Sequence, residues 1–142
     1  MAAELAVIDI LRDDATLGAL VGGTGTDAKV YPYEIPQKVS FPCVVVSVED
    51  VEPNDDKDGT SPLDVEYIAV EFMDTKLKNT ASSSGTYHMA VAGRSALDRT
   101  SGSYNGITVQ SIQFQSSDSY VTEINNKVIY IQEDIYKVRV VR

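Results

Sequence analysis

The chain has 142 residues, of which 43% are hydrophobic and 23% are charged, with 9 glycines and 5 prolines. This composition excludes collagen-like, coiled-coil and wholly disordered chains, and the length predicts a single domain spanning residues 1–142. The 12 basic and 21 acidic side chains give a formal net charge of −9, so the molecule as a whole repels phosphate backbones and anionic membrane surfaces. A general nucleic-acid-binding function is therefore disfavoured.

Cysteine content and the apolar runs bear on the compartment. Cys43 is the only cysteine, which excludes an intramolecular disulfide and a multi-cysteine zinc site and suits a reducing compartment. No basic region precedes the first apolar residues, and no apolar run approaches the roughly 18 residues that span a bilayer. We expect neither secretion nor contact with a membrane.

The beginning of the chain predicts two short helices. Apolar side chains recur every three residues over about residues 3–12, as on one face of a helix. Asp13 or Asp14 can cap a second helix, and Gly22 and Gly23 tolerate the positive φ that ends one.

The next segment predicts strands. Pro32, Pro36 and Pro42 exclude a helix or a central strand over residues 29–42, so we expect an extended crossing with one short edge strand. Residues 43–49 alternate between apolar and polar side chains.

A second alternating run, residues 64–73, places Ile68, Val70 and Phe72 on one face and Glu71 on the other. The two runs predict a hairpin around an acidic loop, residues 49–63.

The second half of the chain predicts a helix and two strands. Small residues recur at three and four over about residues 86–99, after a loop that ends in a helix N-cap, so this helix can lie close across the sheet. Gly102 and the pair Asn105-Gly106 indicate turns. The apolar side chains of the next strand change phase after Val109, which a β-bulge would absorb.

The last strand, residues 127–141, carries Tyr136, Val138 and Val140 on one face, and Lys137 and Arg139 on the other. Consecutive strand pairs separated by a helix predict an α+β fold with a mostly antiparallel sheet, packed by a short N-terminal helical segment and one central helix.

Two stretches imitate ligand-binding motifs. Residues 23–28 match the letters of a dinucleotide fingerprint, but they lack the preceding strand and the following helix that hold a pyrophosphate. Residues 54–59 resemble the first half of a calcium loop, whose twelfth position would be Val65 and which Pro62 interrupts. We therefore expect no nucleotide site at the first stretch, and we interpret the second as a solvated hairpin tip rather than a weak site for a divalent ion or a basic partner.

Candidate catalytic residues are few. His88 is the only histidine, so it has no second histidine for a zinc site, and we expect it on a helix surface. Cys43 opens an apolar strand, where a buried thiol is commoner than a reactive one. The serines at 82–84 lack the frame of a hydrolase nucleophile elbow. The sequence therefore predicts no catalytic residue, cofactor or metal site.

The order of the elements resembles a known family. The stretches that carry the likeness are Leu20-Val-Gly-Gly, Lys29-Val-Tyr-Pro, Phe41-Pro-Cys-Val-Val-Val and Tyr104-Asn-Gly-Ile. They are similar in order and spacing, over nearly the whole chain, to the tail completion or tail terminator proteins of long-tailed bacteriophages and related phage-like particles. None of these stretches is a chemical signature.

The resemblance implies a non-enzymatic virion protein, assembled in the host cytoplasm, that forms a ring, typically of six copies, on the head-proximal end of the tail tube. Such a ring stops tube growth and joins tail to head, so its partners would be further copies of itself, the tail tube protein and a head-completion or neck protein. DNA would pass through its channel without specific binding, which an acidic protomer suits.

Charged side chains suggest where copies meet. We expect the acidic hairpin tip, with Asp55, Asp56 and Asp58, and the loop at residues 74–85 to contact neighbouring subunits or adjoining rings. Lys137 and Arg139 form a basic face on an acidic molecule, which favours self-association through complementary patches. Two other functions stay open: a head-closure or connector protein of the neck, and a small acidic ligand- or metal-binding domain.

Overall fold

The computed structural model describes residues 3–22, 28–34, 40–56, 59–75 and 85–141, and for residues 53–56 and 59–63 it describes the backbone only. Three helices and six strands make up this part of the chain. Their bounds are α1 (Ala3–Asp13), α2 (Ala15–Val21), β1 (Val30–Pro32), β2 (Cys43–Asp56), β3 (Gly59–Asp74), α3 (Thr86–Leu97), β4 (Gly102–Tyr104), β5 (Ile107–Ile124) and β6 (Lys127–Val141).

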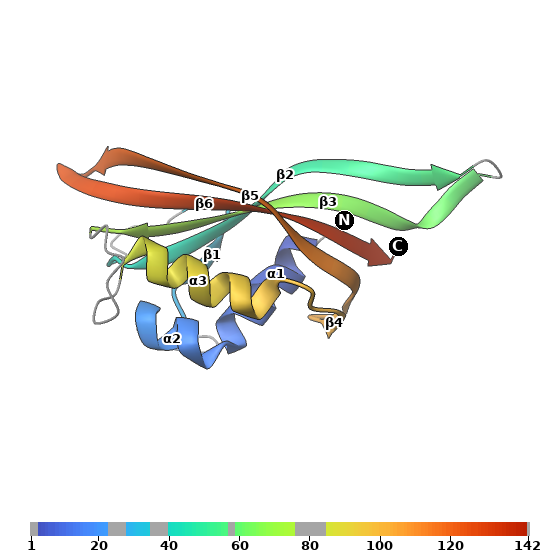
Figure 1. The fold of residues 1–142 in the computed structure, drawn as a ribbon, viewed down its shortest axis with the longest axis horizontal. Helices are drawn as coiled ribbons and strands as arrows, with labels where there is room; N and C mark the ends of the chain where they lie inside the picture. The colour runs from blue at the N-terminus through green and yellow to red at the C-terminus, as the bar shows by residue number, and fades with distance from the viewer. Residues whose placement is uncertain (1–2, 23–27, 35–39, 57–58, 76–84, 142) are drawn as a thin grey trace.

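The six strands form one sheet in the order β1-β2-β3-β6-β5-β4. All neighbours pair antiparallel except β1 and β2, which are parallel, so the predicted α+β fold with a mostly antiparallel sheet is confirmed. The three helices lie together on one face of the twisted sheet, and the β2–β3 and β5–β6 hairpins extend past them in opposite directions (Figure 1). None of the described helices is long and apolar enough to cross a membrane.

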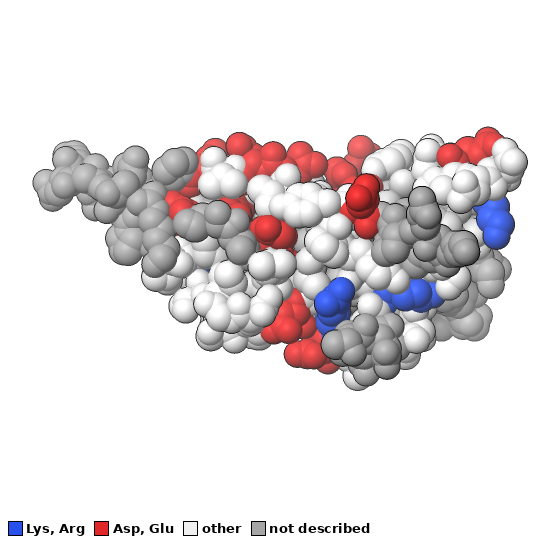
Figure 2. All heavy atoms as spheres, turned by 180° about the vertical axis from the view of Figure 1, so that it is seen from behind, with Lys and Arg blue, Asp and Glu red and all other residues white. Residues whose placement is uncertain are grey.

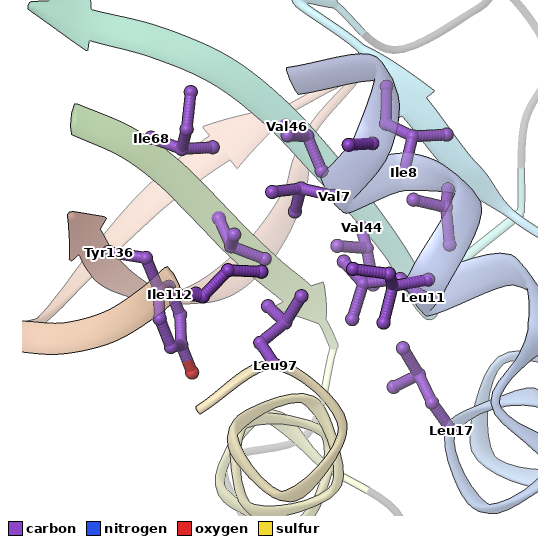
Figure 3. Close-up of a cluster of buried hydrophobic side chains, with 14 of the residues drawn as sticks. Val7, Ile8, Leu11, Leu17, Val44, Val46, Ile68, Leu97, Ile112 and Tyr136 are labelled. Atoms are coloured by element: carbon purple, nitrogen blue, oxygen red, sulfur yellow. The ribbon is translucent and has the colours of Figure 1, made fainter. Parts of the chain in front are cut away.

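The main core lies between the helices and the sheet, where Val7, Leu11 and Leu17 meet Val44 and Ile112 (Figure 3). Each of these side chains is almost completely buried. Burying one large aliphatic side chain contributes about 1.5–3 kcal/mol, so this layer is the main source of stability. This core contains the apolar faces of β2, β3 and β6 that the alternation of apolar and polar residues predicts.

The ends of α2 follow the prediction. The side chain of Asp14 accepts a hydrogen bond from the Leu17 N–H at 2.8 Å, which satisfies a donor that the helix itself leaves free. Gly22 ends the helix with a φ of 92°, a left-handed conformation that glycine adopts without steric cost.

Helix α3 lies close against the sheet through Gly93, as its small residues predict. A Cβ atom at this position would lie 2.5 Å from Cζ of Phe72, so only glycine permits the observed spacing. The end of α3 is joined to β5 by two hydrogen bonds: the Arg99 N–H donates to the Ile112 carbonyl, and the Phe114 N–H donates to the Asp98 carboxylate. The N-cap is Gly85, which makes no side-chain hydrogen bond.

Two β-bulges shape β5. The first, between Val109 and Ser111, confirms the bulge that the change of phase predicts. The second, between Phe114 and Ser116, is unexpected and turns Ser117 toward the helix side, where its hydroxyl donates to the Asp134 carboxylate at 2.6 Å. Each bulge bends the strand, which helps β5 follow the curled sheet.

The acidic segment departs from the prediction. Residues 49–56 and 59–63 lie in strands rather than in a loop: β2 continues to Asp56 and β3 begins at Gly59, and these two residues pair with each other. Aspartate and asparagine disfavour strands on intrinsic grounds, and the ladder of backbone hydrogen bonds that the hairpin extends outweighs this preference. Gly102 also differs, because it opens the short strand β4 rather than a turn. The turn at Asn105-Gly106 is confirmed, with positive φ at both residues.

Candidate assembly surface

The face of the sheet opposite α1, α2 and α3, here called the helix-free face, changes in side-chain character along its length. Near the β5–β6 turn it carries a second apolar cluster, formed by Cys43, Val45, Met73, Ile129 and Ile131. Cys43 is fully buried there, as predicted, and burial raises the pKa of its thiol to about 12. The thiol is therefore protonated and unreactive near neutral pH.

Carboxylates occupy the middle of the helix-free face. Glu71 of β3 and Asp118 of β5 lie on either side of Glu133 of β6, as direct neighbours in the ladder. The Tyr120 hydroxyl donates to a Glu71 carboxylate oxygen at 2.7 Å. Burial raises the pKa of Glu133, and the nearby carboxylates Glu71, Glu49 and Asp118 raise it further. In Figure 2, acidic side chains gather along the upper side of the molecule, where the sheet lies.

Lys137 and Arg139 occupy the same face of β6, beyond this acidic group. Lys137 pairs with Tyr67 on one side and Gln113 on the other, and both basic side chains are half-buried. Tyr136, Val138 and Val140 point the opposite way into the core, so the predicted division of β6 into two faces is confirmed.

The predicted acidic residues lie far from this basic pair. Asp55 and Asp56 belong to the outer end of β2, where they pair with Thr60 and Gly59, past the last residue of β6 that pairs with β3. Asp58 lies outside the described residues, as does most of the predicted contact loop at 74–85. Within one protomer, the structure therefore brings Lys137 and Arg139 together and leaves the acidic tip apart from them.

The sequence alone does not predict that Glu71, Asp118 and Glu133 form a cluster. Alternation assigns each carboxylate to a face of its own strand, but only the register between strands shows that three of them share one row. The single available signal is that Glu71 interrupts an apolar run on the polar side of its strand.

A buried carboxylate lies on the helix side, beside the start of α1. Glu66 of β3 is fully buried. Burial raises its pKa most strongly, the Ala3 amide lowers it, and the neighbouring carboxylates Glu4 and Asp64 raise it again. The Tyr33 hydroxyl donates to Glu4 at 3.2 Å.

An apolar groove of about 470 Å³ separates α2 from α3. The residues that line it are Thr16, Ala19, Leu20, His88, Val91, Ala92 and Ser95. Val91 is 52% exposed, and the neighbouring Tyr87 is 48% exposed. Arg94 lies next to them on α3, with its guanidinium 3.8 Å from the centre of the Phe114 ring.

No catalytic arrangement is found in the described part of the chain. His88 lies on α3 as predicted, half-buried at the edge of this groove, and its ring packs edge-on against Tyr87. The described residues include no group of three or more His, Cys, Asp or Glu side chains that could hold a metal ion. Residues 23–27 and 82–84, which the fingerprint and the serine stretch include, lie outside the described residues.

Comparisons with known proteins assign the chain to a family. The family model described as Tail completion protein gp17 matches residues 5–126. No curated protein matches the chain. Among solved structures, a chain of the "Virion of native gene transfer agent (GTA) particle" is similar in fold, with a TM-score of 0.72 and 22% sequence identity over 98% of this chain and 94% of that chain. The protein thus belongs to the Tail completion protein gp17 family, whose members are non-enzymatic structural components of the tails of phage-like virions.

Proposed function

We propose that the protein forms a ring of six copies that caps the head-proximal end of the tail tube, stops tube growth and joins the tail to the head. The observation that carries this proposal is the family match over residues 5–126. Its partners would be further copies of itself, the tail tube protein and a head-completion or neck protein.

The shape of the protomer supports a ring. The β2–β3 and β5–β6 hairpins extend in opposite directions past the helices (Figure 1). A chain with different contact surfaces on its two sides associates head to tail, and such contacts close into rings when the rotation between copies permits.

The charges of the protein support both a contact between copies and a channel through which DNA passes. The acidic end of β2, with Asp55 and Asp56, lies apart from Lys137 and Arg139 within one copy. Opposite charges that are separated within one copy can meet between two copies, and this steers association. The net charge of −9 opposes adsorption of DNA, as a channel for its passage requires.

Electron microscopy of particles from a strain that lacks the gene tests this function. We expect overlong or irregular tails beside filled heads without tails. Unattached tails of normal, uniform length would instead indicate a head-closure or connector role in the neck, and intact virions would contradict any role in assembly.

A further inference from the structure

The outer side of β5 forms a long edge of the sheet. β4 pairs only with Ile107–Val109, so no described strand pairs with the outer side of β5 beyond that point (Figure 1). Every side chain from Gln115 to Val121 is exposed, although successive side chains point to opposite faces of the sheet. Within the described part of the chain, this half of β5 is therefore uncovered on its edge and on both faces.

The other described edges of the sheet are closed to a further strand. β1 and β4 are three residues long, the Arg12 guanidinium donates to the outward Val30 carbonyl at 2.7 Å, and Pro32 has no N–H. Beyond β1, the pairing of β2 has two register shifts, and the strand contains Pro53. Short strands, bulges and prolines are the means by which proteins keep edges from pairing. Residues 116–124 of β5 contain no proline, lysine or arginine, and no register shift.

The backbone of β5 presents hydrogen-bonding groups along this edge. The Ser119 N–H donates to the carboxylate of its own neighbour Asp118 at 2.9 Å, so it points away from β6. In an antiparallel ladder alternate residues direct both backbone groups to the same side, so the N–H and C=O of Val121 and Glu123 point the same way. Asp118 thus covers one donor of an edge that can pair with an added strand.

The charge beside the edge selects the kind of strand. A side chain opposite Asp118 would extend the row that Asp118 forms with Glu133 and Glu71 on the helix-free face. The described part of this row contains no base. Lys137 lies four residues from Glu133, about 13 Å along β6, and Lys127 pairs with the last residue of β5, about 20 Å from Asp118. An added strand with a lysine or arginine at this position would therefore complement the row.

The apolar side chains beside the edge select the rest of the strand. Tyr120, 41% exposed, follows Asp118 on the helix-free face, and Val121, 58% exposed, lies on the helix side. Apolar side chains opposite Val121 would form cross-strand pairs of the kind that stabilises sheets. The edge thus fits an extended segment with basic residues on one face and apolar residues on the other.

From these observations we infer that residues 116–124 of β5 bind an extended basic segment of another protein, which adds to the sheet as a further strand. The backbone of the segment accepts the Ser119 N–H, and a lysine or arginine pairs with the Asp118 carboxylate that this releases. A second copy of β5 is a poorer occupant, because the strand contains acids and no lysine or arginine. The inference goes beyond the proposed ring and does not depend on it.

Synthetic peptides test the inference. The probe is a capped peptide of about ten residues in which lysine and valine alternate, so that one face is basic and the other apolar. Two matched peptides serve as controls: one has glutamate in place of lysine, and one keeps the lysines but carries N-methyl groups on alternate backbone nitrogens, which removes the hydrogen bonds of one edge. Isothermal titration calorimetry with the full chain measures binding. We expect each control peptide to bind about tenfold more weakly than the probe.

Two variants of the protein separate backbone pairing from charge. Ser119→Pro removes an outward N–H and leaves the bonds to β6, and its control Ser119→Ala keeps the N–H. Asp118→Lys reverses the charge of the row, and its control Asp13→Lys makes the same change at an exposed position on α1. Ser119→Pro and Asp118→Lys should each weaken binding of the probe about tenfold, and the controls should not. Circular dichroism checks that all four variants fold.

Amide hydrogen exchange gives a readout that charge alone would not move. Binding of the probe should slow exchange at Ser119, Val121 and Glu123, and leave the residues between them unchanged. Equal affinity for the N-methylated peptide, or equal affinity of wild type and Ser119→Pro, would overturn the added strand. Protection at Val51 of β2 instead would place the peptide on the other side of the sheet and overturn it too. Protection without any peptide, with dimers that Ser119→Pro abolishes, would show that a second copy occupies the edge and would overturn the basic segment as its partner.

Discussion

The two faces of the sheet differ in burial, although the same strands contribute to both. On the helix side, Ile68, Val70 and Phe72 of β3 are fully buried among helical side chains. On the helix-free side, the alternate residues of the same strand include Glu71 and Tyr67, which remain partly accessible. Substitutions of these buried residues should therefore change stability, and substitutions of the partly accessible residues on the second face should change assembly.

The largest expected effect is a cavity in the core. Leu11→Ala removes a fully buried side chain between α1 and the sheet, and should lower the free energy of unfolding by about 3 kcal/mol. Urea denaturation measures it. Val128→Ala, at a 52% exposed position, should change the free energy of unfolding by less than about 0.5 kcal/mol. Equal losses in the two variants would refute the distinction between the helix-covered core and the exposed end of the β5–β6 hairpin.

A smaller loss is expected at the contact between α3 and β3. Gly93→Ala places a methyl group where 2.5 Å separates it from the Phe72 ring, and should cost about 2 kcal/mol through displacement of α3. Ser95→Ala, at an exposed position of the same helix, is the control and should have little effect. Combining Gly93→Ala with Phe72→Leu should cost less than the sum of the two single losses, and strict additivity would argue against the contact.

The buried Glu66 predicts a pH dependence. Its pKa in the folded protein is raised above the ordinary value of 4.5, so the folded state binds its proton more tightly than the unfolded state. Below pH 4.5, the ordinary pKa, the carboxyl group is protonated in both states and the folded protein has its full stability. That stability is lost as the pH rises through the raised pKa, because the buried group must then ionise. Glu66→Gln should therefore raise stability at pH 7 by about 1 kcal/mol and flatten this part of the profile. Thermal unfolding between pH 4 and pH 8 measures both, and a destabilised variant at pH 7 would contradict the argument.

The smallest effect on stability is expected on the helix-free face. The double change of Lys137→Glu and Arg139→Glu should shift the free energy of unfolding by less than about 0.5 kcal/mol, because both side chains keep access to water. The same change should abolish ring formation at low salt, as followed by analytical ultracentrifugation. The pair Lys137→Arg and Arg139→Lys, which keeps both charges, should assemble normally. Rings from the charge-reversed variant would remove these residues from the interface.

Much of the fold could be predicted because its signals are local. Asp14 and Gly22 mark the ends of α2 through capping chemistry that acts within four residues. The change of phase near Val109 indicates a bulge within one strand. Such features are determined by residues that are close in the sequence, so they can be predicted without knowledge of the fold.

The remaining features depend on contacts between distant segments. The pairing of Asp56 with Gly59 extends a hairpin through residues that disfavour strands, and the row formed by Glu71, Glu133 and Asp118 exists only through the register of three strands. The groove between α2 and α3 joins residues 16–20 to residues 88–95. No periodicity within one element reports such a contact.

The order of strands in the sheet has a consequence for how the chain folds. The β2–β3 and β5–β6 hairpins join neighbours in the sequence, whereas β3 and β6 pair across more than fifty intervening residues, between Asp74 and Lys127. Local pairings form faster than distant ones, because closing a long loop costs more entropy. A newly made chain is therefore expected to form the β2–β3 and β5–β6 hairpins before β3 pairs with β6 and joins the two halves of the sheet.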